Sequence, residues 1–478
     1  MKQTIKILSL AVLMATGGAC TKDIGKFNEE TKNAAVVPAG PLFTNASKTL
    51  SDGLVSAAVG TNIYRHFVKH WAQAVIQEEA QYDFVTRATH TSWWSRMYRD
   101  VLNDLKESAR IVSEDEAMEA REKANKLAII DVMQVYTMNI LVNTFGNVPY
   151  TQALDSENLF PAYDDAKTIY VDLLSRLEAD VNALDVTGAG FSTTEDLFYQ
   201  GDVEKWVAFA NSLRVMMAMT IADVDNDLAK STFEAANPGA MSSPADDAIL
   251  NYYPNVPNNN PLYNQLVTAG RTDFIAAKDL MDVLIEKEDP RKSQFFGVND
   301  KGEYIGGVVG VASDYYGMSK PSDKVAAPDA PFVLLDYMET EFYRAEAKER
   351  GYNVSGTAEE HYNNAIEASI LYWGGTADEV STYLQRPDVA YTTAEGDWRQ
   401  KIGVQKWIGL YNRPFDGWTE LRRLDYPELP LAVSAISGFP NRMLYPGTEQ
   451  TVNADNYAAA SAAIGGDKVE TKLFWDVH

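Results

Sequence analysis

Apolar residues recur at three- and four-residue steps through most of the chain, which is the pattern of amphipathic helices. In the first half, this pattern predicts helices at Leu54–Gln77, Trp94–Val112, Glu116–Asn143, Asp164–Leu184 and Val203–Ala222. Turns rich in glycine and proline follow the third and fourth of these segments and end them. We therefore expect a mainly α-helical fold.

The segment 237–331 has a different pattern. Pro, Gly and Asn become frequent there, as in 255–261 and 306–310. These residues favour long loops and short strands, and we expect them around one helix near Ala276–Lys287. Because ordered loops on a rigid frame commonly carry binding sites, this loop-rich insertion is the candidate binding region.

Helical periodicity resumes after the insertion, at Phe332–Arg350 and Ala358–Trp373. Small and aromatic residues of these two segments and the turn between them loosely match a tetratricopeptide helix pair, in which small residues let two helices approach closely. They are Ala345, Gly351, Ala358, Tyr362 and Ala365. Strict 34-residue periodicity is absent. One more helix is expected at Trp398–Tyr411, followed by a proline-rich coil with few regular elements.

The first twenty residues have the pattern of a secretory signal. Lys2 and Lys6 precede the apolar run Ile7–Ala15, and small residues lead up to Cys20, the single cysteine of the chain. This arrangement resembles the bacterial lipobox, which implies cleavage before Cys20 and lipidation of Cys20; a cleavage site with an incidental cysteine is the alternative. We expect a signal peptide at 1–19, a lipid-anchored tether at 20–35 and the folded body at 36–478.

Two or more acyl chains on Cys20 would give stable membrane attachment, and no later segment is expected to replace that anchor. The most apolar later stretches, Leu127–Phe145 and Val207–Ala222, are interrupted by polar residues and are interpreted as buried helices. Acidic residues soon after Cys20 resemble the surface-export signal of Bacteroidetes lipoproteins. We therefore expect the protein at the outer membrane, facing the cell exterior.

The charge balance excludes nucleic acid as the default partner. The chain has 42 Lys and Arg against 67 Asp and Glu, a net charge of −25. Nucleic-acid binding depends on clustered Lys and Arg residues that displace counterions, and the sequence contains no such basic cluster.

Signals for metal binding are weak. His66 and His70 have the i, i+4 spacing of a shared metal site, but Phe67 stands where a zincin has Glu, so we interpret them as the polar flank of an amphipathic helix. Acidic residues 223, 225, 227 and 234 match the spacing of an EF-hand loop, but Leu228 occupies the place of the required glycine. The alternative is an acidic helix end, and we expect no metal and no cofactor.

Signals for catalysis are also weak. Gly-x-Ser-x-Gly is missing, and the many carboxylates show no local signature of a glycosidase pair. We expect a protein that is not an enzyme and has no catalytic residue. A surface hydrolase acting on glycan or peptide is kept as the alternative.

Aromatic rings in glycine-, proline- and asparagine-rich loops are the candidate ligand contacts, because they can stack on sugar faces or on peptide side chains. Packing is the alternative for each ring. The candidates, with polar neighbours that could add hydrogen bonds, are Tyr82, Arg87, Trp93, Tyr252, Tyr253, Asn259, Asn260, Tyr315 and Tyr316. Trp94 is assigned to the core, since it precedes Tyr98 by four residues on one helix face.

The last quarter of the chain carries the most specific motifs. KWIGLY at 406–411, FDGWTELRR at 415–423 and FPNRMLYP at 439–446, together with FGNVPY at 145–150, resemble the SusD/RagB-like nutrient-binding lipoproteins. The resemblance implies a SusD-like helical body built on tetratricopeptide-like pairs, with 332–373 as the late pair. Glu420, Arg422 and Arg423 are interpreted as a structural ion-pair network; a substrate clamp is the alternative.

The same resemblance implies a function. A protein of this family would capture a nutrient at the cell surface and deliver it to a SusC-like TonB-dependent transporter. We expect an oligosaccharide ligand, with an oligopeptide as the alternative. A tetratricopeptide scaffold without small-ligand affinity is a third hypothesis.

Overall fold

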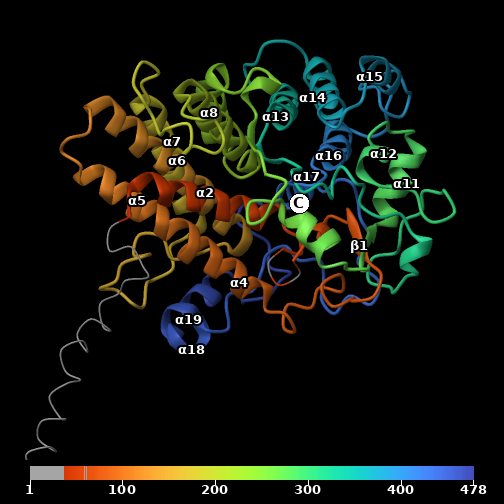
Figure 1. Ribbon diagram of the computed structural model, residues 1–478, viewed down its shortest axis with the longest axis horizontal. Helices are drawn as coiled ribbons and strands as arrows, with labels where there is room; N and C mark the ends of the chain where they lie inside the picture. The colour runs from red at the N-terminus through yellow and green to blue at the C-terminus, as the bar shows by residue number, and fades with distance from the viewer. Residues whose placement is uncertain (1–36, 59, 61) are drawn as a thin grey trace, which may run out of the picture.

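The computed structural model of the protein describes residues 37–478 except 59 and 61 (Figure 1). The expected signal peptide, Cys20 and the tether lie outside the described residues.

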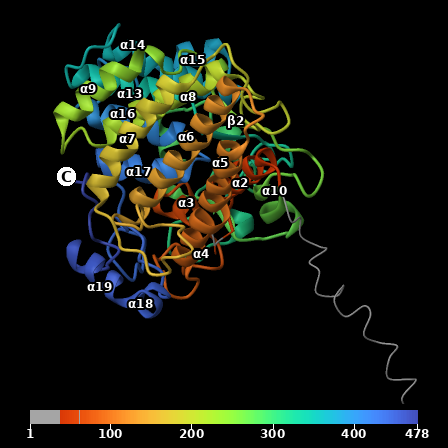
Figure 2. The same ribbon diagram turned by 90° about the vertical axis from the view of Figure 1, so that its left-hand side faces the viewer.

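The N-terminal half is a group of packed helices. Figure 2 shows α5, α6, α7 and α8 of this group side by side, with α18 and α19 at one end of the molecule. The elements of the half are α2 (Ala39–Val55), α3 (Tyr64–Phe67), β1 (Trp71–Gln73), α4 (Thr89–Ser95), the π-helix η2 (Arg96–Leu102), α5 (Asn103–Glu114), α6 (Ala120–Phe145), α7 (Ala166–Ala183), α8 (Val203–Thr220) and α9 (Asn226–Ala236).

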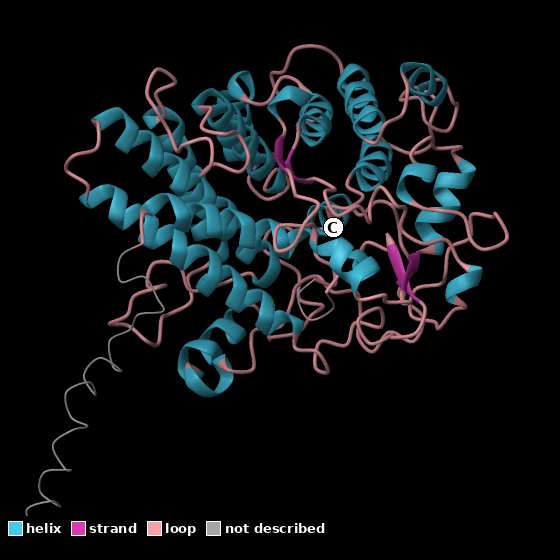
Figure 3. Ribbon diagram, in the orientation of Figure 1, coloured by secondary structure: helices cyan, strands magenta, loops and turns pink. Residues whose placement is uncertain are grey.

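The middle of the chain is rich in loops and carries three of the four short strands of the described residues (Figure 3). β1 pairs antiparallel with β3, with Trp71 opposite Ala276, and β2 pairs antiparallel with β4, with Leu250 opposite Phe332. The elements are η3 (Asn237–Gly239), η4 (Pro244–Asp246), β2 (Ala248–Leu250), α10 (Pro261–Tyr263), η5 (Asn264–Thr268), β3 (Phe274–Ala276), α11 (Lys278–Glu286), α12 (Lys292–Phe295), η6 (Tyr315–Gly317) and β4 (Phe332–Leu335).

Helices return in the last third, where α13 packs against α14 and both α13 and α17 pack against α16. The elements are α13 (Tyr337–Glu349), α14 (Ala358–Tyr372), α15 (Ala377–Leu384), α16 (Trp398–Gly409), α17 (Pro414–Leu424), α18 (Glu449–Val452) and α19 (Ala454–Ala463). The mainly helical fold is therefore confirmed.

Side-chain caps explain where many of the predicted helices begin. Asp165, Asp202 and Asp336 accept hydrogen bonds from backbone N–H groups at the first turns of α7, α8 and α13. Thr357 and Glu360 form a reciprocal capping box at the start of α14. Such caps satisfy N–H groups that have no partner within the helix.

Helix α6 is the central core helix. Among the described residues, it is the one helix long and apolar enough to cross a membrane by length and composition, and 83% of its apolar window is buried within the protein. This burial confirms the interpretation of Leu127–Phe145 as a buried helix.

The single helix predicted at Leu54–Gln77 is wrong. The chain leaves α2 at Val55, forms the short α3 and then enters β1. Lys69 has a left-handed backbone with φ of 50°, which ends helical geometry before Trp71. The apolar residues of this segment do not form one face of a helix. Burial extends to all sides of the chain here, as all three residues of β1 show.

Two smaller predictions in the last third are corrected in the same way. The segment Phe332–Arg350 begins as β4 and becomes helical only after the cap Asp336. The expected coil after Tyr411 contains α17, α18 and α19, and α15 was not predicted; neither was α9, which lies before the loop-rich insertion. Pro414 marks the start of α17, since proline at the first helical position needs no hydrogen-bonding N–H.

His66 and His70 are core residues, and the prediction of a polar helix flank is wrong. Nδ1 of His66 lies 3.2 Å from the carbonyl oxygen of Trp71, and Nε2 of His70 lies 3.0 Å from that of Trp407. Burial lowers the pKa of both imidazoles, that of His70 to about 3, so both stay neutral at pH 7.

Candidate functional site

Three loops form one surface beside the β1–β3 sheet. We call it the loop face and define it as residues 74–88, 305–320 and 431–437. Asp273, the residue directly before strand β3, anchors the first loop, because its Oδ1 accepts hydrogen bonds from the N–H groups of Val75 (2.9 Å) and Ile76 (3.0 Å). Val75 and Ile76 follow the end of β1 by two and three residues, so the start of the loop is fixed beside the sheet.

Backbone hydrogen bonds join the three loops to one another. They run from Ser313 to Ala74 (2.9 Å), from Val433 to Val309 (3.0 Å) and from Ile436 to Gln81 (3.0 Å), with the N–H of the first residue as donor. The side-chain amide of Gln81 adds a bond to the carbonyl oxygen of Gly310 (3.0 Å). Loops connected in this way hold their side chains in fixed positions, which lowers the entropy cost of binding.

Gly310 is the point where two of the loops come closest. Its φ is +87°, and a Cβ atom placed on it would lie 2.1 Å from the carbonyl oxygen of Val433. Only glycine satisfies both the backbone angle and the spacing. The glycine-rich run 306–310 therefore serves close packing of loop against loop.

The loop face exposes several large aliphatic side chains. Those with more than a third of their surface exposed are Val75, Val85, Ile305, Val308, Val311, Leu431, Val433 and Ile436. Exposed apolar side chains gathered on joined loops are typical of interaction surfaces. Sequence reasoning restricted to aromatic rings missed these residues; valine in a glycine-rich loop was the available signal.

Two of the predicted site residues, Tyr315 and Tyr316, lie together on the loop face. Their rings meet edge to face at 5.4 Å, and Tyr316 is 59% exposed. Nζ of Lys320 lies 5.0 Å and 5.3 Å from the two ring centres and 3.1 Å from Oδ1 of Asp300. This arrangement offers a ligand an exposed ring with a charged hydrogen-bond donor beside it.

Tyr82 and Trp93 are buried. The ring of Tyr82 packs edge to face on Phe67, and its hydroxyl oxygen accepts a hydrogen bond from the N–H of Ala432 (3.3 Å). Trp93 packs against Tyr64 and Phe415 in the core. Tyr82 thus supports the loop face from below, and Trp93 lies farther inside.

Arg87 is the partly exposed candidate of the first loop. Its Nε lies 3.1 Å from Oε1 of Glu79, a carboxylate with 0% side-chain exposure. The ion pair fixes Arg87 at the margin of the loop face, where its remaining guanidinium N–H groups can face a ligand.

The remaining candidates lie in the loop 251–260. Tyr253 is 67% exposed, whereas the hydroxyl of the buried Tyr252 donates to Oδ1 of Asp52 (2.7 Å). Asn259 and Asn260 are buried and hold the loop together, through hydrogen bonds to Asn264 and to the carbonyl oxygen of Ala330. Among the described residues, no contact joins Tyr253 to Tyr315 or Tyr316, so it marks a separate position.

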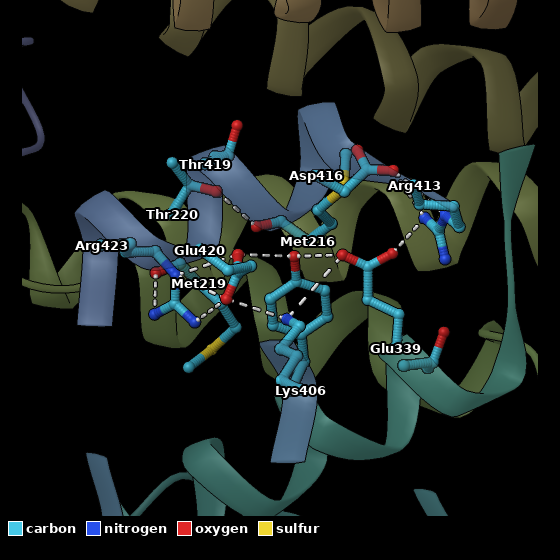
Figure 4. A network of polar contacts seen from close by, with 12 residues as sticks. Met216, Met219, Thr220, Glu339, Lys406, Arg413, Asp416, Thr419, Glu420 and Arg423 are labelled. Carbon is cyan, nitrogen blue, oxygen red and sulfur yellow. Dashed lines mark hydrogen bonds and ion pairs between the residues drawn. The ribbon is translucent and has the colours of Figure 1, made fainter. Parts of the chain in front are cut away.

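A buried ion-pair network connects α13 with α16 and α17 (Figure 4). Arg423 bridges two carboxylates: its Nη2 lies 2.5 Å from Glu346 and 2.7 Å from Glu420. Burial opposes ionisation of Glu420, but Arg423 and Lys406 outweigh it and lower the pKa of Glu420 to about 2. The structural network predicted for Glu420 and Arg423 is confirmed.

The other end of the network surrounds Glu339. The hydroxyl of Tyr343 lies 3.0 Å from carboxylate oxygens of both Glu339 and Glu420, and Nζ of the fully buried Lys406 lies 3.0 Å from Glu420 (Figure 4). Arg413 Nη2 lies 2.5 Å from Glu339 and 3.0 Å from Asp416. In these contacts, residues of the C-terminal motifs hold helices α13, α16 and α17 together.

Arg422 has a different structural role. Its guanidinium lies 3.5 Å from the ring centre of Trp418, and its Nη1 donates to the carbonyl oxygens of Asn143 (3.0 Å) and Asn441 (2.7 Å). It therefore joins α17 to the end of α6 and to the C-terminal segment.

The EF-hand spacing forms no metal cluster. Asp223 pairs with Arg350 (2.8 Å) and Arg399 (2.9 Å), while the side chain of Asp225 caps α9. Within residues 37–478, excepting 59 and 61, no group of three or more His, Cys, Asp or Glu side chains could hold a metal ion.

The helix pairs and the loop-rich centre define a class of fold that solved structures share. A chitin-binding protein is 25% identical over 92% of this chain and 100% of that chain, with a TM-score of 0.79. A chitin-binding SusD homologue from Flavobacterium johnsoniae is 22% identical over 92% and 98% of the two chains, with a TM-score of 0.76. A SusD homologue from Bacteroides uniformis is 22% identical over 91% and 99%, also with a TM-score of 0.76.

The family follows from the sequence match. Residues 31–446 match the SusD-like family described as "Starch-binding associating with outer membrane". The chain belongs to this family, as the C-terminal motifs predicted. None of the curated proteins matches the chain by sequence.

Proposed function

We propose that the protein captures an oligosaccharide at the cell surface and delivers it, unchanged, to a SusC-like TonB-dependent transporter of the outer membrane. The observation that carries the proposal is the loop face, where three joined loops present Tyr315 and Tyr316 beside Lys320. An exposed tyrosine ring can stack on the apolar face of a pyranose, and a lysine can donate hydrogen bonds to hydroxyl groups.

Chito-oligosaccharides are the first probes of this proposal. The similar structure at 25% identity is a chitin-binding protein, and one of the less similar neighbours is a chitin-binding SusD homologue. Oligopeptides are the second ligand class, because the exposed valines of the loop face would also suit apolar side chains. Arg87, at the margin of the loop face, and Tyr253, in the separate loop 251–260, are further candidate contacts.

The location follows from the expected lipid anchor. Lipidation at Cys20 would hold the folded body at the outer membrane through acyl chains, and the loop face would pass ligand to the transporter. Co-purification of the lipidated chain with one β-barrel transporter from the native outer membrane tests this part. Recovery of the chain alone, with its lipid anchor intact, would oppose it.

Replacing Tyr316 by Ala is expected to weaken oligosaccharide binding about tenfold, because loss of one stacking ring removes roughly 1–1.5 kcal/mol. Isothermal titration calorimetry with chito-oligosaccharides measures the change. The Tyr315→Ala variant should lose binding in the same way, since each ring orients the other at 5.4 Å.

Phe160→Ala is the matched control for this test. Phe160 is 54% exposed, and its carbonyl oxygen accepts a hydrogen bond from Asn456 in α19, away from the loop face. The control should bind as the parent chain does. Equal losses in all three variants, or no loss in either tyrosine variant, would remove the loop face as the binding site.

A further inference from the structure

A cavity lies between the β2–β4 sheet and the helices α13, α14 and α16. Its volume is about 410 Å³, within the range of small-molecule sites. It shares no residue with the loop face, so an inference about it does not depend on the proposed function. Leu371 and Tyr372, which are 44% and 38% exposed, lie on its open side.

Most of the wall is apolar or aromatic. Ile249, Val333 and Met338 are aliphatic lining residues, and the aromatic residues Tyr372, Trp373 and Tyr411 line the same space. Trp373 and Tyr411 are held in place by Phe295, with ring centres at 4.8 Å and 4.0 Å from it. Fixed aromatic rings around an apolar space favour organic cations, which the electron-rich faces of the rings attract.

One end of the cavity carries more carboxylates than cations. Asp247 and Asp336 line it, and Arg413 is the basic residue of the lining. Nη1 of Arg413 lies 3.1 Å from Oδ1 of Asp336, but Arg413 also pairs with Glu339 and Asp416 behind the wall (Figure 4). The single guanidinium of Arg413 is therefore shared by three carboxylates, those of Asp336, Glu339 and Asp416.

Asp247 is the carboxylate without a cation of its own. Its Oδ1 accepts a hydrogen bond from the N–H of Tyr337 (2.7 Å), and among the described residues no Lys or Arg nitrogen lies within 4 Å of it. A carboxylate in this setting can be neutralised by taking up a proton or by a bound cation.

We propose that this cavity binds a small organic ammonium compound, with its cationic head at Asp247 and Asp336 and its apolar body against Tyr372, Trp373 and Met338. Selectivity for a cation comes from the aromatic wall and the unpaired carboxylate acting together. A neutral molecule of the same shape would contact the aromatic wall but would not pair with the carboxylates.

Proton release accompanies binding at this site. Burial and the neighbouring Asp336 raise the pKa of Asp247 to about 8, and burial raises that of Asp336. The groups that face Asp247 are Asp336, Asp246, Arg413 and the hydroxyls of Tyr199 and Tyr372. At pH 7 Asp247 holds a proton, which an ammonium compound must displace.

The affinity for a permanent cation should therefore rise about tenfold per pH unit up to pH 8 and level off above it. The probe is benzyltrimethylammonium, whose charge does not change with pH, and calorimetry from pH 6 to 9 gives the affinity. Benzyl alcohol is the neutral probe and should bind at least about tenfold more weakly at pH 9.

Asp247→Asn retains the acceptor for the N–H of Tyr337 and removes the charge. It should weaken benzyltrimethylammonium binding at least about tenfold at pH 9 and flatten the pH dependence. This variant separates the titration of Asp247 from that of Asp416, a carboxyl paired with Arg413 whose pKa burial raises to about 7. Leu371→Trp, at an exposed position on the open side, should block binding without disturbing the core.

Asp282→Asn is the control, because Asp282 is an exposed carboxylate of α11 paired with Lys278. It should leave binding unchanged. Absence of saturable binding by the parent chain, equal affinity for benzyl alcohol, or unchanged affinity in Asp247→Asn would overturn the proposal. Chito-oligosaccharide binding that Leu371→Trp abolishes would make the cavity a sugar site instead and would also overturn it.

Discussion

Replacing Arg423 by Met is expected to lower the free energy of unfolding by about 3–5 kcal/mol, because it leaves buried carboxylates short of a cation. Arg423 is 2% exposed and contacts Glu346 at 2.5 Å and Glu420 at 2.7 Å. Methionine fills much of the same volume, so the decrease in the free energy of unfolding measures the effect of removing the charge. Urea unfolding at pH 7, followed by tryptophan fluorescence, measures it.

The loss should shrink as the pH falls. In the parent chain the pKa of Glu420 is lowered to about 2, so its contribution is fully present above its ordinary pKa of about 4.5 and is lost as the pH falls toward 2. The variant has little of this contribution to lose. The gap between the two chains should therefore be smaller at pH 4 than at pH 7.

Arg110→Met is the control for the network. Arg110 pairs with Glu107 and Glu114 on the exposed face of α5, where solvent screens the charges. The control should unfold almost as the parent chain does. An Arg423→Met variant as stable as the control would show that the network does not hold α13 to α17.

Replacing Gly310 by Ala is expected to distort the loop face and to reduce oligosaccharide affinity at least about tenfold. The φ of +87° costs an L-residue roughly 1–3 kcal/mol, and the new Cβ would lie 2.1 Å from the carbonyl oxygen of Val433. The loop 431–437 must then move away from 305–320. Calorimetry and amide hydrogen exchange of residues 431–437 measure the two effects.

Gly302→Ala is the matched control. Gly302 has a φ of +82°, but no atom lies within 4 Å of its hypothetical Cβ. Both variants therefore place an alanine at a similar positive φ, and only Gly310→Ala adds the collision with Val433. Faster exchange and weaker binding in both variants alike would attribute the effect to strain and not to the contact between loops.

Local chemistry accounts for the part of the fold that the sequence predicted. Helices such as α8 and α14 combine an apolar face with a cap directly before them, Asp202 and Thr357, and both signals lie within a few residues. Strand β1 differs, because its partner Ala276 is 205 positions after Trp71. No local pattern distinguishes a short buried strand of this kind from a buried helix.

The candidate site was predictable only in part, for a similar reason. Composition identified the loops that carry aromatic rings but not the direction in which each ring points. Tyr82 turns inward onto Phe67 and hydrogen-bonds Ala432, whereas Tyr316 stays exposed. The difference depends on contacts between loops more than 200 residues apart in the chain, such as that between Gln81 and Gly310.

Oligosaccharide capture without turnover is tested by calorimetry of the chain starting just after Cys20, with oligosaccharides and oligopeptides as ligands and product analysis for every ligand that binds. We expect saturable binding of an oligosaccharide that is recovered intact. Release of shorter products would contradict it in favour of a hydrolase. Binding of oligopeptides alone, or of neither class, would contradict oligosaccharide capture.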